Sequence, residues 1–183
     1  MTSVSFEQAP AWVAEQLAAG GPGTRWVGVD GLGAAGKSTL AARIAAALPG
    51  SVLLPIDHFG RAALRDWDRD LFVAQVVEPL LAGRPGRYRR WDLVADRGLD
   101  WVDVPVGVPV VVEGVSSTDV RLPVPWDLRL WVDASEDVRR ARIADRDPPE
   151  LLARWAADWW PSEQEYVDAQ DPRTRADAVV SSD

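Results

Sequence analysis

The chain has 183 residues with 20 basic and 28 acidic side chains, a formal net charge of −8. This length suits one domain with a sizeable core, and the acidic balance argues against nucleic acid as a partner. No cysteine is present, which excludes disulfides, Cys-ligated zinc and thiol catalysis. The first basic residue is Arg25, and no apolar run approaches the roughly 20 residues that span a bilayer. We therefore expect a cytoplasmic protein with no membrane partner.

The first third of the chain alternates helical periods with short apolar runs. An apolar stripe predicts a helix over 6–19, and the run RWVGVD predicts a strand over 25–30. A glycine-rich turn follows over 31–36, and good helix formers predict a helix over 38–48. The run SVLLPI predicts a second strand over 51–56.

The rest of the chain continues this alternation. A helical period covers 66–81, and 84–103 predicts loops with at most a short ribbon. Apolar runs predict buried strands over 108–112 and 128–132. Later predicted elements are helices over 135–145, 150–160 and 162–169, and a strand over 178–180. Such alternation predicts one α/β domain over 1–183, with helices flanking a mainly parallel sheet of about five strands and ligands at the carboxyl ends of the strands.

Residues 31–38 read GLGAAGKS and match the phosphate-loop pattern G-x-x-x-x-G-K-[ST]. In such a loop the backbone N–H groups face phosphate oxygens, a lysine reaches the β and γ phosphates, and a hydroxyl ligates Mg²⁺. Lys37 is the only lysine in the chain and stands between a predicted strand and a predicted helix. The predicted triphosphate contacts are Gly31, Gly33, Ala34, Ala35, Gly36, Lys37, Ser38 and Thr39.

The same glycines also spell the dinucleotide fingerprint G-x-G-x-x-G, and Asp57 lies 21 residues beyond Gly36, near the place of a ribose-binding acid. An NAD(P)-binding oxidoreductase is therefore an alternative. It is disfavoured because Lys37 follows the third glycine, where a helix should pack on the sheet, and because 183 residues barely allow a substrate domain. A nucleotide-binding regulator or NTPase without an acceptor is the other alternative.

GTP-binding switches read guanine through Asn-Lys-x-Asp, and this chain has no asparagine. Its sequence resembles the uridine kinase, phosphoribulokinase and pantothenate kinase group of phosphate-loop kinases. The resemblance rests on VGVDGLGAAGKSTLA (27–41), IDHF (56–59), RRWD (89–92), VVVEG (110–114) and RRARIADRD (139–147). It implies a three-layer phosphate-loop NTPase fold, ATP and Mg²⁺ as cofactors, and transfer of the γ-phosphate to a hydroxyl of a small metabolite, with a nucleoside leading.

The resemblance also implies roles for single residues. An acid at Asp57 takes the acceptor's proton or holds a metal-bound water, and an acid at Glu113 serves Mg²⁺ or the substrate. Arginines spaced along 139–150 form a short lid over the γ-phosphate. The expected catalytic residues are Lys37, Asp57, Arg142 and Arg146, and the expected metal-site residues are Ser38, Asp57 and Glu113.

The acceptor is expected to contact Arg90, Trp91, Asp92 and Arg97 as well as Glu113. Uridine kinases carry a histidine soon after the aromatic–Asp pair, and this chain has Asp96-Arg97 there instead, so the acceptor stays open. His58, Trp155 and Trp159 either line the site or only pack. The donor base and the oligomeric state, a homodimer included, also stay open.

Overall fold

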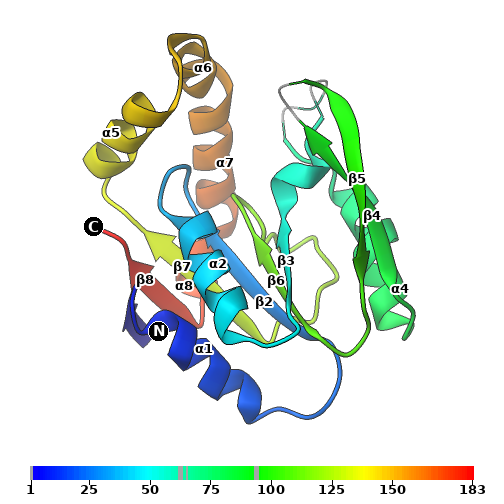
Figure 1. Cartoon of the computed structure of the whole chain (residues 1–183). Coiled ribbons are helices and arrows are strands. Elements are labelled where there is room, and N and C mark those ends of the chain that lie inside the picture. The colour runs from blue at the N-terminus through cyan, green and yellow to red at the C-terminus, as the bar shows by residue number, and fades with distance from the viewer. Residues whose placement is uncertain (1, 62–63, 65, 93–94) are drawn as a thin grey trace.

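The computed structural model describes residues 2–61, 64, 66–92 and 95–183 (Figure 1). Its main sheet has six strands in the order β1-β8-β7-β2-β6-β3, and all neighbours are parallel. These strands are β1 (Thr2–Ser5), β2 (Arg25–Gly31), β3 (Val52–Pro55), β6 (Pro109–Glu113), β7 (Leu128–Asp133) and β8 (Ala178–Ser181). The predicted parallel α/β sheet is confirmed, with six strands rather than about five.

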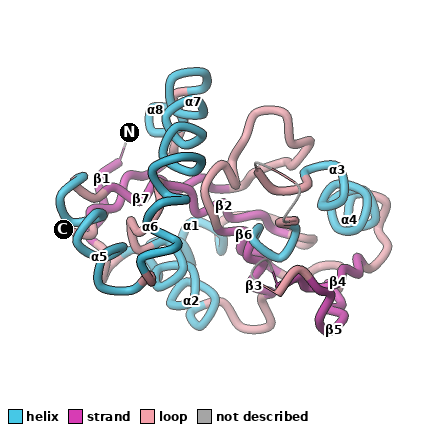
Figure 2. Tube along the Cα trace, turned by 90° about the horizontal axis from the view of Figure 1, so that it is seen from above, coloured by secondary structure: helices cyan, strands magenta, loops and turns pink. Residues whose placement is uncertain are grey.

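Helices cover both faces of this sheet. Figure 2 shows α1 (Ala9–Ala18) and α2 (Lys37–Ala47) on one side, and α7 (Trp160–Gln170) and α8 (Pro172–Arg175) on the other. Each strand can contribute side chains to the core on both faces of the sheet, because successive side chains point to opposite faces. Val27 and Val29 of β2 pack in the core under α1 and α2, whereas Trp26 packs in the core of the opposite face.

The sixth strand, β1, was missed because only Val4 among its four residues is buried, so the sequence carries no apolar run. It pairs with β8 at the edge of the sheet, Thr2 opposite Ala178. Residues 6–8 form the turn that joins this strand to the helix predicted over 6–19, which therefore begins only at Ala9.

A separate antiparallel hairpin stands beside the main sheet. It pairs β4 (Gly86–Asp92) with β5 (Arg97–Val104), with a register shift between Arg89 and Trp91. This is the short ribbon allowed for in 84–103; residues 93 and 94 of that segment lie outside the described residues. Tyr88 and Val104 are buried and fix the hairpin to the core.

Two helical segments contain a π turn just before a proline. The first runs through α3 (Arg69–Phe72), a π turn over Val73–Val77 and α4 (Glu78–Leu81), and the second through α6 (Pro149–Arg154), a π turn over Trp155–Trp159 and α7. The residue before each proline donates its N–H five residues back, Glu78 to Val73 and Trp160 to Trp155. The predicted break between 160 and 162 is therefore wrong, because the π turn lets the helix continue through Pro161, which has no N–H to donate.

The remaining helix, α5 (Glu136–Arg146), follows β7 directly. In Figure 1, α5 and α6 stand on one side of the carboxyl ends of the strands, and the β4–β5 hairpin stands on the other. None of the helices in the described ranges is both long and apolar enough to cross a membrane.

Candidate active site

The phosphate loop joins the end of β2 to the start of α2, at the carboxyl edge of the sheet. Two of its glycines have backbone φ values that side chains rarely adopt, +149° at Gly31 and +98° at Gly36. A Cβ at Gly31 would also lie 2.5 Å from the carbonyl oxygen of Val132. A side chain at Gly31 would therefore clash with the neighbouring strand β7, and Gly36 forms the N-cap of α2.

Lys37 is folded over this loop. Its side chain is buried, and Nζ donates to the carbonyl oxygen of Leu32 at 2.8 Å. Gly33, Ala34, Gly36, Ser38 and Thr39 line the same cavity as Lys37, whereas Gly31 and Ala35 are not among the described lining residues. The loop thus presents a cation and the amino terminus of α2 to one space, an arrangement that suits phosphate groups.

Ser38 and Glu113 lie close together beside the loop. Strand register places Glu113 opposite Val29 on one side and Pro55 on the other, so the ends of three strands meet here. The Ser38 hydroxyl donates to Oε2 of Glu113 at 3.3 Å. Burial raises the pKa of Glu113, although the charge of Lys37 opposes this shift.

These groups fit a magnesium ion by their chemistry. Mg²⁺ prefers oxygen ligands and is usually bound by one or two carboxylates together with substrate phosphates. Ser38, Asp57 and Glu113 supply a hydroxyl and two carboxylates that line one cavity. Across the described residues no cluster of three or more His, Cys, Asp or Glu side chains forms a metal site by itself. A metal held here would therefore need phosphate oxygens to complete its ligands.

Asp57 lies in a 3₁₀ turn, Ile56–Phe59, directly after β3, which ends at Pro55 rather than at the predicted residue 56. The turn carries it beyond the sheet edge, so its side chain is exposed in the cavity. Its negative charge is close enough to contribute to the raised pKa of Glu113.

The three arginines expected in the lid all lie on α5 but make different contacts. Arg142 donates to the carbonyl oxygen of Ala34 at 3.1 Å and to that of Ser182 at 2.6 Å, so it ties the phosphate loop to the segment after β8. Arg146 is 59% exposed and pairs with its neighbour Asp147 at 2.6 Å. Arg139 is turned inward. Only Arg142 and Arg146 of the three are among the residues lining the cavity.

His58 packs rather than faces the cavity. Its Nδ1 lies 3.2 Å from the Tyr88 hydroxyl, and the two rings stack with centroids 5.8 Å apart. Burial lowers the pKa of His58, with a further lowering by Arg90 and an opposing effect of Asp57.

Of the residues expected to contact an acceptor, Trp91, Asp92 and Glu113 line the cavity, and Arg90 and Arg97 are not among its described lining residues. Arg90 pairs with Asp100 at 2.8 Å within the hairpin. Arg97 is exposed and stands opposite Asp92 in the hairpin register. The hairpin therefore brings one tryptophan and one carboxylate to the site.

A tryptophan pair from the lid side faces the same space. Trp155 and Trp159 have ring centroids 4.7 Å apart in an edge-to-face arrangement, and both line the cavity. Trp155 is also buried against Gly33, where a Cβ would lie 2.4 Å from its ring. Trp155 and Trp159 therefore pack against each other and also line the cavity.

Sequence reasoning missed several lining residues. Arg61 stacks over Trp91 at 4.2 Å, and Trp67 comes from the segment before α3. At the far end, Arg43 lies 5.3 Å from the ring of Phe6. No local motif marks these residues, because the fold alone brings their segments to the site.

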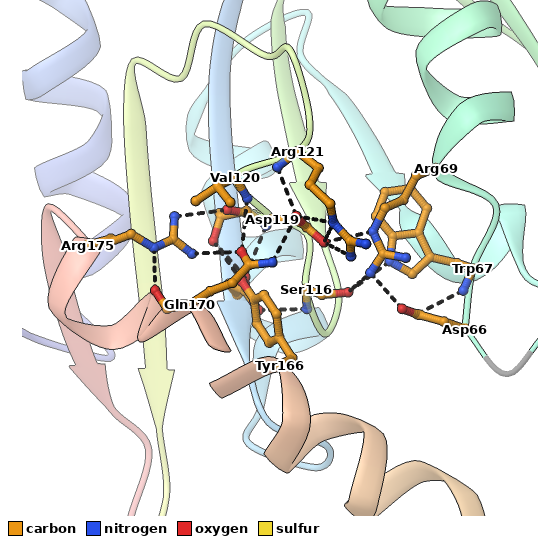
Figure 3. A network of polar contacts seen from close by, with 12 residues as sticks. Asp66, Trp67, Arg69, Ser116, Asp119, Val120, Arg121, Tyr166, Gln170 and Arg175 are labelled. Atoms are coloured by element: carbon orange, nitrogen blue, oxygen red, sulfur yellow. Dashed lines mark hydrogen bonds and ion pairs between the residues drawn. The ribbon is translucent and has the colours of Figure 1, made fainter. Parts of the chain in front are cut away.

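A buried polar network holds the loop that follows Glu113 (Figure 3). Asp119 is fully buried and accepts from Arg69 at 2.9 Å and from Gln170 at 3.0 Å. Burial alone would raise the pKa of Asp119, but hydrogen bonds from Arg121 and Gln170 and the charge of Arg69 hold it well below its usual range. The network joins the start of α3 to the end of α7 behind the site.

Asp30, at the base of the phosphate loop, is a second buried acceptor. It is 1% exposed and accepts from the backbone N–H of Ser116 and of Thr118 at 3.0 Å each, and from the Tyr166 hydroxyl at 2.7 Å. The loop after β6 and helix α7 are thereby fastened to the same strand that leads into the phosphate loop.

The lining residues named above belong to one cavity of about 1340 Å³, and neither Asp30 nor Asp119 is among its described lining residues. One end, lined by the phosphate loop with Phe6, Arg43 and Ser182, is here called the phosphate-loop end. The other, lined by Asp57, Arg61, Trp67 and Trp91, is called the hairpin end. Glu113 and the lid residues line the same cavity.

No protein-family model matches the chain, and no curated protein matches it either. Among solved structures, a possible uridine kinase from Bacillus stearothermophilus is similar, with a TM-score of 0.74, 18% identity, and coverage of 96% of this chain and 98% of that one. The "putative fructose transport system kinase" from Silicibacter sp. TM1040 is similar too, with a TM-score of 0.70, 20% identity, and 97% and 99% coverage. The chain therefore shares the fold of these two proteins over almost its whole length, and the predicted α/β fold with helices flanking a parallel sheet is confirmed.

Proposed function

We propose that the protein is an ATP-dependent, Mg²⁺-requiring phosphotransferase that moves the γ-phosphate to a hydroxyl of a small metabolite. The observation that carries this proposal is the two-ended cavity. Its volume of about 1340 Å³ exceeds the roughly 300–1,000 Å³ usual for the pocket of one drug-sized ligand. A regulator that only bound a nucleotide would not need the hairpin end with its exposed Asp57.

The phosphate-loop end would hold the donor. Backbone N–H groups of the loop and Lys37 would bind the β and γ phosphates, and Ser38 with Glu113 and Asp57 would hold the Mg²⁺. When bound, this ion neutralises charge on the triphosphate. Arg146, exposed on the last turn of α5, can reach from its partner Asp147 toward the charge that develops on the γ-phosphate oxygens.

The hairpin end would hold the acceptor. Its hydroxyl oxygen would form the new bond to the γ-phosphorus as the bond to the β–γ bridging oxygen breaks, leaving ADP. Asp57 would orient that hydroxyl and accept its proton. Because phosphoryl transfer passes through a loose transition state, positioning by Asp57 should contribute more than proton removal.

A nucleoside is the leading acceptor, and both similar structures carry names of kinases. Trp91 lines the cavity from the hairpin and Trp159 lines it from the lid side, so aromatic side chains are available for a planar base to stack on. Such a metabolite and ATP are both found in the cytoplasm, which is the compartment that we propose, and neither nucleic acid nor membrane is a proposed partner.

A metabolite panel assayed for ADP release with Mg-ATP tests this function, with Asp57→Asn beside the parent. We expect one class of alcohol to stimulate ADP release, and Asp57→Asn to lower transfer by roughly 10²-fold, the lower end for a positioned general base. ATP should still bind, because Lys37, the loop N–H groups, Ser38 and Glu113 remain to hold the triphosphate and its Mg²⁺. Asp137→Asn, exposed on α5 and not among the residues that line the cavity, is the control and should match the parent.

Two results would replace the proposal with another function. Steady ATP hydrolysis that no acceptor stimulates would indicate a regulator or NTPase. A larger thermal shift with NAD than with ATP would indicate the dinucleotide-binding oxidoreductase.

A further inference from the structure

Helix α7 reaches the phosphate loop with a carboxylate that the proposed transfer does not use. Oε1 of Glu163 accepts the backbone N–H of Gly33 at 2.9 Å. The side chain of Glu163 is only 8% exposed, and Arg139 of α5 lies 3.8 Å from its Oε2. Glu163 is therefore fixed between the loop and α5.

Burial at this position disfavours the negatively charged form of Glu163. Burial raises the pKa of Glu163, whereas Lys37, the Gly33 N–H and Arg139 act in the opposite direction and Asp30 adds to the rise. Lys37 faces it from the phosphate loop, Arg139 from α5 and Asp30 from β2. A buried carboxylate beside a loop that suits phosphate would oppose an anionic ligand, so packing alone does not account for it.

The contacts around Gly33 link the loop to the lid. The ring of Trp155 covers Gly33, and its Nε1 donates to Asp147 at 2.7 Å, the same carboxylate that pairs with Arg146. Glu163 accepts the N–H of Gly33 beside that ring, and a Cβ at Gly33 would lie 2.7 Å from its Oε1. One residue of the loop is thus in contact with both the π turn and the first turn of α7.

We propose that Glu163 is a positioning residue that sets the shape of the phosphate loop through the Gly33 N–H, so that the loop is formed before a nucleotide arrives. In this role the side chain of residue 163 must place an oxygen atom where it accepts the Gly33 N–H, and its negative charge is not required. The part of the proposal that concerns turnover rests on the proposed phosphotransferase function, whereas the part that concerns the loop does not.

Two conservative variants of Glu163 separate the effect of side-chain length from the effect of the negative charge. Glu163→Gln keeps an acceptor oxygen at the same reach and removes the charge, and Glu163→Asp keeps the charge and shortens the side chain by one methylene. Asp168→Ala on the exposed side of the same helix is the matched control, since Asp168 contacts Gln164 there.

Hydrogen–deuterium exchange of the peptide over 31–38, measured without nucleotide, reads the loop directly. Losing one hydrogen bond of ordinary strength should make exchange at Gly33 roughly 5- to 10-fold faster in Glu163→Asp, with Glu163→Gln and Asp168→Ala near the parent. ATP affinity in Glu163→Gln should equal or exceed that of the parent. Where an acceptor is known, kcat should fall by about 10-fold in Glu163→Asp, with KM for the acceptor unchanged, and recover in Glu163→Gln.

Parent-like exchange in Glu163→Asp would overturn the proposal, and so would equal damage in the Gln and Asp variants, since the negative charge would then be needed as well as the reach. If no alcohol is phosphorylated but exchange follows the expected pattern, the proposed function fails and the positioning role stands.

Discussion

At the phosphate-loop end of the cavity, polar side chains of the loop itself and of distant segments bond to backbone groups of the loop, whereas at the hairpin end the charged side chains are exposed or bonded within their own segment. Lys37, Arg142 and Glu163 each contact a backbone group of the phosphate loop. Arg61 donates to the carbonyl oxygen of the preceding residue, and Asp57 is exposed. The phosphate-loop end is therefore the more rigid of the two, which suits the proposed role of holding the triphosphate, because preformed hydrogen-bond donors cost no reorganisation at the moment of reaction.

The largest effect is expected for Lys37→Ala, which tests whether the phosphate-loop end binds phosphate. If the phosphate-loop end is preorganised for a triphosphate, removing its one lysine should lower turnover by about 10²- to 10³-fold and weaken ATP far more than adenosine. Rates from the kinase assay and affinities from calorimetry check both effects. Unchanged affinity and rate would mean that this end does not bind phosphate.

The two lid arginines test the same difference, because Arg142 bonds to the phosphate loop whereas Arg146 is exposed. Arg146→Ala should lower turnover by roughly 10²-fold and leave the melting temperature near that of the parent, since exposed ion pairs contribute little to stability. Arg142→Ala leaves the carbonyl oxygens of Ala34 and Ser182 without this donor, and should reduce the free energy of unfolding by about 1–3 kcal/mol. Denaturation and kinetics on both variants decide this, and a reversed order of effects would show that the roles are exchanged.

The smallest expected effect concerns His58 beside the hairpin end. The chain has one histidine, so a single imidazole resonance should titrate by NMR, with a midpoint below the ordinary 6.5 because burial lowers its pKa. A lowered folded-state pKa gives stability that is present above 6.5 and lost as the pH falls through the folded value. His58→Gln should therefore lose less of its free energy of unfolding than the parent between pH 7 and pH 5. A midpoint at or above 6.5 would mean that the imidazole is solvated.

The sequence predicted what depends on local patterns. The strand, the glycine loop and the helix that begins at Lys37 are neighbours in the chain, so periodicity and one motif locate them together. Parallel strand ends meet at one sheet edge, which is why Asp57 and Glu113 could be expected near Lys37. Both do line its cavity.

Contacts between distant segments were beyond prediction. Glu163 is 130 residues from Gly33, and Ser182, whose hydroxyl donates to the carbonyl oxygen of Ala35, is 147 residues from it. Helical spacing placed Arg142 on α5, but not the direction of its side chain, because its partner Ala34 lies 108 residues away. The missed strand β1 has the same cause, since its pairing with β8 joins the two ends of the chain.

The π turn over Trp155–Trp159 has a consequence for which side chains face the loop. An α-helix turns by about 100° per residue, so the eight residues from Trp155 to Glu163 would leave these side chains about 80° apart. A single π turn adds one residue without adding its rotation, and the offset becomes that of seven residues, about 20° in the other direction. The same inserted residue that accommodates Pro161 therefore aligns Trp155 and Glu163, and both can contact Gly33 from one helical face.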